Sequence, residues 1–175
     1  IITGNMATDT VPNQEALGNA WFVKGIDVKK GPAEVMSALS FFNPKDTAII
    51  EQKDNIESLN NLESDENASI ALVNNKNDEI NYTSSSTKKQ LAVFSEIYYD
   101  LGWKAYIDNV ETPIVKTNYV LRGLVVPAGN HAIRFEFKPT TIKNSIIAST
   151  FASILLWLGI VAMIVMAYRN KQKSI

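Results

Sequence analysis

The sequence contains no cysteine and one histidine among its 175 residues. A domain without cysteine does not depend on disulfides, and a lone histidine argues against a structural zinc site, which draws on several Cys and His ligands. That histidine, His131, directly follows a turn and is interpreted as a surface residue at the start of a strand. Neither a nucleophile elbow nor a Gly-rich phosphate loop is present, so no catalytic constellation is predicted.

An excess of charge of one sign is also lacking. The chain carries 17 basic and 18 acidic residues, for a net charge of −1. This balance gives no argument for nucleic acid as a partner. The acidic residues between 52 and 67 are not spaced as a calcium-binding loop, so this segment is predicted to be an exposed loop.

What the sequence does contain is a long apolar run near its end. Residues 145–168, SIIASTFASILLWLGIVAMIVMAY, carry no charge. A helix of this length, at about 1.5 Å per residue, can cross the roughly 30 Å hydrocarbon core of a bilayer. Trp157 and Gly159 lie mid-span, where a small residue beside a ring indicates packing against neighbouring helices. A transmembrane helix with the lipid bilayer and further membrane helices as partners is therefore predicted.

Basic residues set the expected orientation of this helix. Arg169, Lys171 and Lys173 follow the run, whereas Lys138 and Lys143 precede it. The small basic excess after the run favours a cytoplasmic C-terminus. The predicted organisation has three parts, which are an extracytoplasmic β-rich domain over residues 1–140, a transmembrane helix over 145–168 and a basic cytoplasmic tail over 169–175.

Short apolar or alternating segments separated by turn formers predict a mainly β domain. Residues 90–98 begin with a nearly continuous apolar run and are predicted to form a central strand, Asp108-Asn109 a tight hairpin turn, and residues 84–87 a polar connection. A short helix is predicted over 33–39. The predicted strands are residues 21–30, 47–51, 69–74, 79–83, 90–98, 103–107, 110–115, 119–125 and 131–137. Several turn-linked strands with one apolar face need a second layer, so an antiparallel β-sandwich with a minor helix is expected.

One group of aromatic and charged residues has the composition of a carbohydrate-binding face, in which rings stack on sugars and polar groups fix hydroxyls. The same rings can instead form the core and a membrane-facing rim. A related hypothesis pairs Glu96, inside an apolar strand, with Arg122, and its alternative is a solvent-facing Glu96. The candidate ligand-binding residues are Tyr98, Tyr99, Asp100, Trp103, Tyr106, Tyr119 and Arg122.

Two long segments and the apolar helix after them carry a family resemblance. LAVFSEIYYDLGWKAYIDNVETPI (residues 91–114) and NYVLRGLVVPAGNHAIRFEFKP (residues 118–139), in this order before a hydrophobic helix, resemble the C-terminal end of the YfhO family of bacterial membrane proteins. GNAWFVKGI (residues 18–26) resembles an element of the Bacteroidetes-type members. One departure is Asp108-Asn109, where the family commonly has Asp-Gly; asparagine also tolerates positive φ.

The resemblance implies a long polytopic parent in the bacterial cytoplasmic membrane that is similar to GT-C glycosyltransferases of the cell envelope. It implies a polyprenyl-phosphate sugar donor for the parent, with no cofactor in this segment, and an envelope glycan as a further partner. The catalytic acids of such enzymes lie in loops near the N-terminal helices, which no part of this chain matches. No catalytic residue is therefore carried over, and the start at Ile1 is taken to indicate a piece of a longer protein.

Three hypotheses about function remain open at this point. The first is an extracytoplasmic accessory domain and last membrane helix of a GT-C-like glycosyltransferase, in contact with glycan or acceptor. The second is a purely structural module that positions the membrane core. The third is a stand-alone single-pass membrane-anchored binding protein.

Overall fold

The computed structural model describes residues 16–54 and 57–173. Two compact units are present, one made of Ile1–Tyr98 with Lys104–Glu136 and the other of Tyr99–Trp103 with Phe137–Ile175. The first fifteen residues of the predicted 1–140 domain lie outside the described residues. The predicted boundaries at 140, 145 and 168 therefore stay predictions.

Three sheets are formed by the described strands. One sheet has the order β1-β6-β10-β9, a second has the order β4-β5-β11-β7-β8, and β2 and β3 form a third. The strands are β1 (Ala20–Val23), β2 (Gly25–Lys29), β3 (Thr47–Glu51), β4 (Ser69–Asn75), β5 (Glu79–Ser86), β6 (Gln90–Ile97), β7 (Trp103–Ile107), β8 (Val110–Thr112), β9 (Val115–Thr117), β10 (Leu121–Val126) and β11 (Gly129–Phe137). The prediction of a mainly antiparallel β fold with a minor helix and a C-terminal apolar helix is confirmed.

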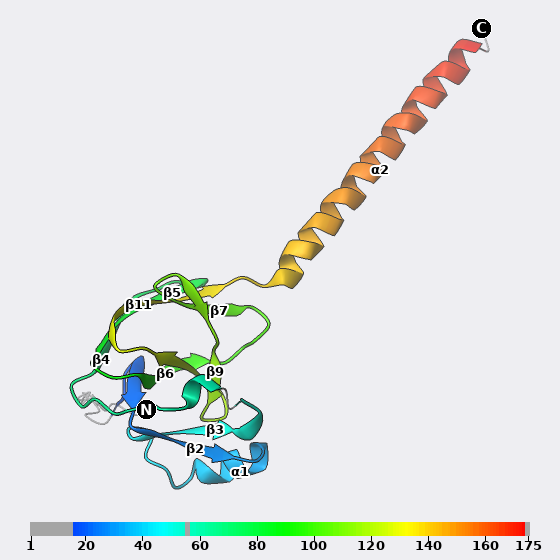
Figure 1. Cartoon of the computed structure of the whole chain (residues 1–175). Coiled ribbons are helices and arrows are strands. Elements are labelled where there is room, and N and C mark those ends of the chain that lie inside the picture. The colour runs from blue at the N-terminus through cyan, green and yellow to red at the C-terminus, as the bar shows by residue number, and fades with distance from the viewer. Residues whose placement is uncertain (1–15, 55–56, 174–175) are drawn as a thin grey trace, which may run out of the picture. The chain divides into compact units, whose positions relative to one another are not determined.

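Strand β6 has partners on both of its faces, which explains its nearly continuous apolar beginning. The Phe94 ring packs edge-on against Tyr82 of β5 and Phe135 of β11, at centroid distances of 4.9 and 4.8 Å. Leu91 and Val93 belong instead to a cluster on the opposite face, together with residues of β1 and β3. Side chains alternate between the two faces of a strand, so each face of β6 contributes to its own core. In Figure 1, β6 and β9 accordingly lie between β5 and β11 on one side and β2 and β3 on the other.

The two-stranded sheet is parallel, which the sequence analysis did not predict. β2 pairs with β3 in the register Gly25↔Thr47 to Lys29↔Glu51. A parallel pair requires a crossover connection, and α1 (Pro32–Ala38) provides it. Pro32 begins this helix, where its missing N–H costs nothing, and Val35 is buried beneath it.

The structure corrects three of the predicted elements. The strand predicted over 21–30 is two strands, because the chain leaves one sheet at Lys24 and enters another at Gly25. Residues 84–86 belong to β5 instead of a connection, because Ser84 and Ser86 are buried against the sheet. The strand predicted over 110–115 is divided at Pro113, which has no N–H for a ladder, and its two parts join different sheets.

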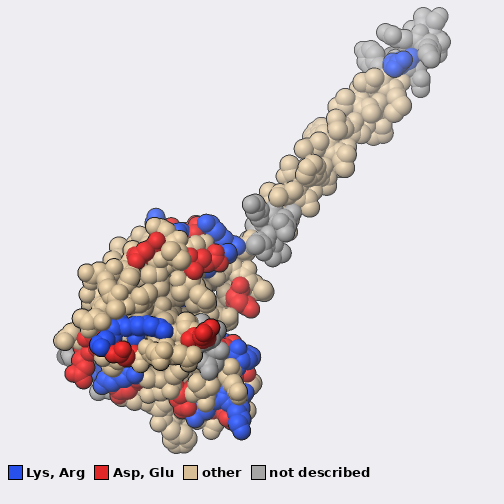
Figure 2. Space-filling model, in the orientation of Figure 1, with Lys and Arg blue, Asp and Glu red and all other residues tan. Residues whose placement is uncertain are grey.

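The second unit is dominated by α2 (Thr140–Lys173). Within it, Ser145–Met166 is long and apolar enough to cross a membrane, and none of this stretch is buried in the described structure. Figure 2 shows it as a surface of neither acidic nor basic residues. The helix starts before the predicted span and continues past it, since no Gly or Pro flanks the apolar run closely enough to end it.

Candidate functional site

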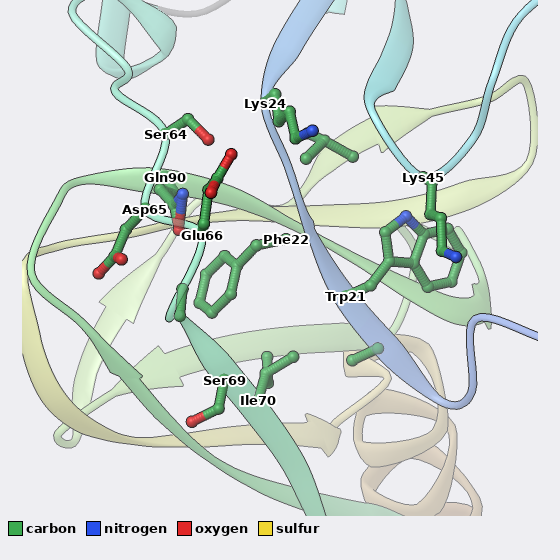
Figure 3. A pocket seen from close by; sticks show the side chains of 13 residues that line it. Trp21, Phe22, Lys24, Lys45, Ser64, Asp65, Glu66, Ser69, Ile70 and Gln90 are labelled. Carbon is green, nitrogen blue, oxygen red and sulfur yellow. The ribbon is translucent and has the colours of Figure 1, made fainter.

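A hollow of ≈ 370 Å³ lies between β1 and β4, the edge strands of the two larger sheets. The loop before β4 forms its remaining wall. Figure 3 shows the side chains around it. The hollow is lined by Ala20, Trp21, Phe22, Val23, Lys24, Lys45, Ser64, Asp65, Glu66, Ala68, Ser69, Ile70 and Gln90. Aromatic, cationic, acidic and amide side chains thus meet at one place on the surface.

Trp21 and Phe22 point in opposite directions, because neighbours on a strand alternate between its faces. Phe22 lies on the side of Glu66, and Trp21 lies on the side of Lys45 (Figure 3). The indole Nε1 of Trp21 donates a hydrogen bond of 2.8 Å to the carbonyl of Pro44. Trp21 is therefore fixed by its own chain, and Phe22 is the ring available to a ligand on the acidic side.

Charged groups of both signs surround the hollow. Lys24 forms an ion pair of 3.0 Å with Asp46. The hydrogen bond to Asp46 and its negative charge raise the pKa of Lys24, and the Glu66 carboxylate adds to this effect. Glu66 and Lys45 are exposed. The rim can thus offer both a hydrogen-bond acceptor and cationic donors to a polar ligand.

The acidic wall is held in place by Asp65. Its Oδ2 accepts hydrogen bonds of 2.7 Å from both the N–H and the hydroxyl of Thr87, and its Oδ1 accepts one of 2.9 Å from the N–H of Asn67. These donors, led by the backbone N–H of Thr87, hold the pKa of Asp65 below its ordinary value. Asp65 is therefore an anionic anchor that fixes the loop, and Glu66 beside it remains exposed to solvent.

Four of the residues predicted as ligand contacts, Tyr98, Tyr106, Tyr119 and Arg122, lie in the first unit. Arg122 is 3 % exposed, donates from Nε to the carbonyl of Ile97 at 2.9 Å, and lies 5.4 Å from the Phe135 ring. Burial lowers its pKa, and the nearby Glu96 carboxylate opposes this shift. Arg122 is thus a core residue of the sandwich.

Tyr106 and Tyr119 have cationic neighbours. The Arg134 guanidinium lies 4.5 Å from the Tyr106 ring, and Lys116 Nζ lies 5.1 Å from the Tyr119 ring. Tyr119 has a positive φ of 71° in the connection that precedes β10. Tyr98 is half-buried, and its N–H donates to the carbonyl of Val120 at 2.7 Å.

The other three predicted residues, Tyr99, Asp100 and Trp103, belong to the second unit. Tyr99 and Trp103 both lie against the Phe137 ring, at centroid distances of 6.4 and 5.3 Å. Asp100 is exposed. Within this unit, then, the structure brings two of the predicted rings together.

The sequence analysis missed the hollow itself. The sequence feature that could have indicated it is the adjacent Trp21-Phe22 pair followed by Lys24, but these residues were interpreted only as part of a strand. The part of the chain that the structure describes holds no group of three or more His, Cys, Asp or Glu side chains that could bind a metal.

Comparison with known proteins identifies the family. A family model described as bacterial membrane protein YfhO matches residues 50–149, more than half of the chain. The chain belongs to the YfhO family. The match begins at the end of β3 and ends inside α2, so it covers β4 to β11 and the beginning of the candidate membrane helix, whereas β1 and β2 precede it. Neither curated proteins nor solved structures give a match.

Proposed function

We propose that this chain is the extracytoplasmic accessory domain and adjoining membrane helix of a longer polytopic YfhO protein, which acts beside a GT-C-like glycosyltransferase core of the cell envelope. The observation that carries the proposal is the YfhO match across residues 50–149, because it joins β4 to β11 and the start of the candidate membrane helix in one family unit. The parent would use a polyprenyl-phosphate sugar and reside in the bacterial cytoplasmic membrane. The role of this chain is to contact the glycan or its acceptor.

The residues that line the hollow between β1 and β4 are better suited to such a contact than the ligand-binding residues predicted from the sequence. Sugars are bound by a ring that stacks on their C–H face and by polar groups that bond their hydroxyls. Phe22 offers the ring, Glu66 offers an exposed acceptor on the same side, and Lys45 offers an exposed donor on the Trp21 side of the rim. Arg122, by contrast, is buried and engaged within the sandwich.

The test is sugar transfer by the full-length parent in membranes, measured with a labelled polyprenyl-phosphate sugar. We expect deletion of the β-domain to abolish transfer. We also expect Glu66→Gln and Lys45→Gln to raise the acceptor concentration needed for half-maximal transfer. Lys76→Gln is the matched control, because Lys76 is exposed in the turn between β4 and β5, away from the lining of the hollow.

A purely structural role is the second candidate, and a specific observation favours it. Tyr106, Tyr119 and Arg122 are engaged by cations, rings and backbone of the same chain, so these groups also serve to hold the fold. In that case the deletion would still reduce transfer, but both rim variants would behave as Lys76→Gln does. The point variants, not the deletion, therefore separate the two functions.

A further inference from the structure

We propose that residues 99–103, which are the loop after β6 and the first residue of β7, form with Phe137 at the end of β11 a foot that lies in the headgroup layer of the bilayer. The inference is independent of the proposed glycan contact, since none of these residues lines the hollow. It rests on the second compact unit alone, which comprises this loop and the chain from Phe137 onward.

The foot has the composition of a membrane–water interface. Trp103, Phe137 and Tyr99 lie ring against ring, with Phe137 in contact with both of the others. Tyr99 is 48 % exposed and Leu101 66 % exposed. Tyr and Trp are enriched at headgroup level because one end of each ring is apolar and the other can bond to water. An exposed leucine beside them adds an apolar group that water does not favour.

The loop is attached to the base of the membrane helix in two ways. The N–H of Lys138 donates a hydrogen bond of 2.7 Å to the carbonyl of Gly102. Gly102 is also so close to the Phe137 ring that a Cβ at this position would collide with Cε2. The absence of a side chain thus permits the contact, and the loop and the chain entering α2 form one local structure.

A short stretch of chain connects Phe137 to the apolar run. Thr140, where α2 begins, precedes Ser145 by five residues. At about 1.5 Å per residue it lies about 7.5 Å outside the apolar run along the helix axis. The headgroup region is about 5 to 8 Å thick on each side of the hydrocarbon core. Thr140 thus lies at the outer side of the headgroup layer, and Phe137 precedes it by three residues, so the continuity of the chain with the span selects lipid as the partner.

The lack of cysteine allows a direct test on the full chain in phosphatidylcholine vesicles, because an introduced cysteine is the only thiol. A spin label is attached to Leu101→Cys, and its collisions with oxygen and with a water-soluble nickel chelate are measured. Val110→Cys is the matched control, since Val110 is a similarly exposed aliphatic residue (68 %) in the β7–β8 hairpin. Leu155→Cys reports the hydrocarbon core.

We expect the Leu101 label to lose most of the nickel-chelate broadening seen at Val110 and to show an oxygen-to-nickel ratio between those of Val110 and Leu155. A Leu101 label as accessible to nickel as the Val110 label would overturn the proposal. Spin–spin broadening at Leu101 that grows with protein density would overturn it in favour of a second copy of the chain. A label-free check uses Trp21→Phe with Trp157→Phe, which leaves Trp103 as the sole tryptophan for quenching by brominated lipids. Absence of quenching would likewise contradict the foot.

Discussion

His131 Nδ1 lies 2.6 Å from Oδ2 of Asp108, and this pair fastens β11 to the turn between β7 and β8. Asp108 and Asn109 have φ values of 49° and 69°, as a two-residue hairpin turn with both central residues in the left-handed region requires. Asp108 also accepts the N–H of Ala132 at Oδ1 and donates its own N–H to the carbonyl of Ala132, both at 2.9 Å. The predicted turn is confirmed, and His131 is a half-buried partner of it.

The pair predicts a pH dependence of stability. The hydrogen bond to Asp108 raises the pKa of His131 above its ordinary 6.5, and His131 with the Ala132 N–H holds the pKa of Asp108 below 3.8. A raised histidine pKa stabilises the fold below 6.5, and this contribution is lost as the pH rises through the folded value. A lowered aspartate pKa contributes above 3.8 and is lost as the pH falls through its folded value. We therefore expect the unfolding temperature, measured by circular dichroism, to decrease from pH 6 to pH 8.

Asp108→Asn is the control for this effect. Asparagine tolerates the left-handed conformation and keeps an oxygen for the Ala132 N–H, but it carries no charge. The unfolding temperature of the variant should change less than that of the unmodified chain between pH 6 and pH 8. An unchanged slope would show that other groups cause the dependence.

The contacts and the positive φ of Asn118 predict that its replacement by glycine and by alanine will lower the stability by different amounts. Its Oδ1 accepts the N–H of Ile49 and its N–H donates to the carbonyl of Ile49, both at 2.8 Å and both buried, while its φ is 48°. Asn118→Gly leaves the Ile49 N–H without its partner, which should lower the free energy of unfolding by about 1–3 kcal/mol. Asn118→Ala should cost about 1–2 kcal/mol more, because alanine resists this conformation. Denaturant titration checks the order, and an alanine variant as stable as the glycine variant would contradict it.

Local patterns account for the elements that the sequence predicted well. Residues 47–51 and 103–107 coincide with β3 and β7, since each is a β-branched or alternating segment bounded by turn formers. The prediction of a polar connection at residues 84–86 was wrong, because serine is usually exposed and its sequence pattern does not indicate the buried positions that Ser84 and Ser86 occupy. The prediction of one strand over residues 110–115 was wrong, because the sheet that each side of Pro113 joins depends on contacts with residues far away in sequence.

The candidate site was less accessible to sequence reasoning for the same reason. Phe22 and Ile70 meet at the hollow only because two edge strands of different sheets lie side by side, and no spacing encodes this. Arg122 was predicted to contact a ligand because it belongs to a group of aromatic and charged residues with the composition of a carbohydrate-binding face. Its burial follows from the Ile97 carbonyl and the Phe135 ring, which come from other strands.

The ring cluster in the sandwich core predicts opposite results for two substitutions. Phe94→Ala removes a fully buried ring and should lower the free energy of unfolding by about 3–5 kcal/mol. Tyr82→Phe should be neutral or slightly stabilising, because the Tyr82 hydroxyl is buried with no hydrogen-bond partner among the described residues. Burial also raises the pKa of Tyr82 to about 12. Chemical denaturation compares both, and a large loss in Tyr82→Phe would reveal a partner for the hydroxyl.

The close approach of Gly102 to the Phe137 ring predicts that a larger residue at position 102 will destabilise the chain near the start of α2. Gly102→Ala would push a methyl group into the Phe137 ring, which Tyr99 and Trp103 also contact. Overpacking of this kind should lower the free energy of unfolding by about 1–3 kcal/mol. The change is measured by thermal unfolding of the full chain in vesicles, with the fluorescence of Trp103 as the local probe in a Trp21→Phe and Trp157→Phe background.

Two further variants separate the collision from a general effect of losing a glycine. Gly25→Ala is the matched control, because a Cβ at Gly25 has no atom within 4 Å, and we expect it to be neutral. Phe137→Leu in the Gly102→Ala background shortens the colliding group and should recover part of the lost stability, a non-additivity expected only of residues in contact. If the double variant loses the sum of both single losses, Gly102 and Phe137 are not in contact, and the loop is not fixed to the base of the helix as the structure has it.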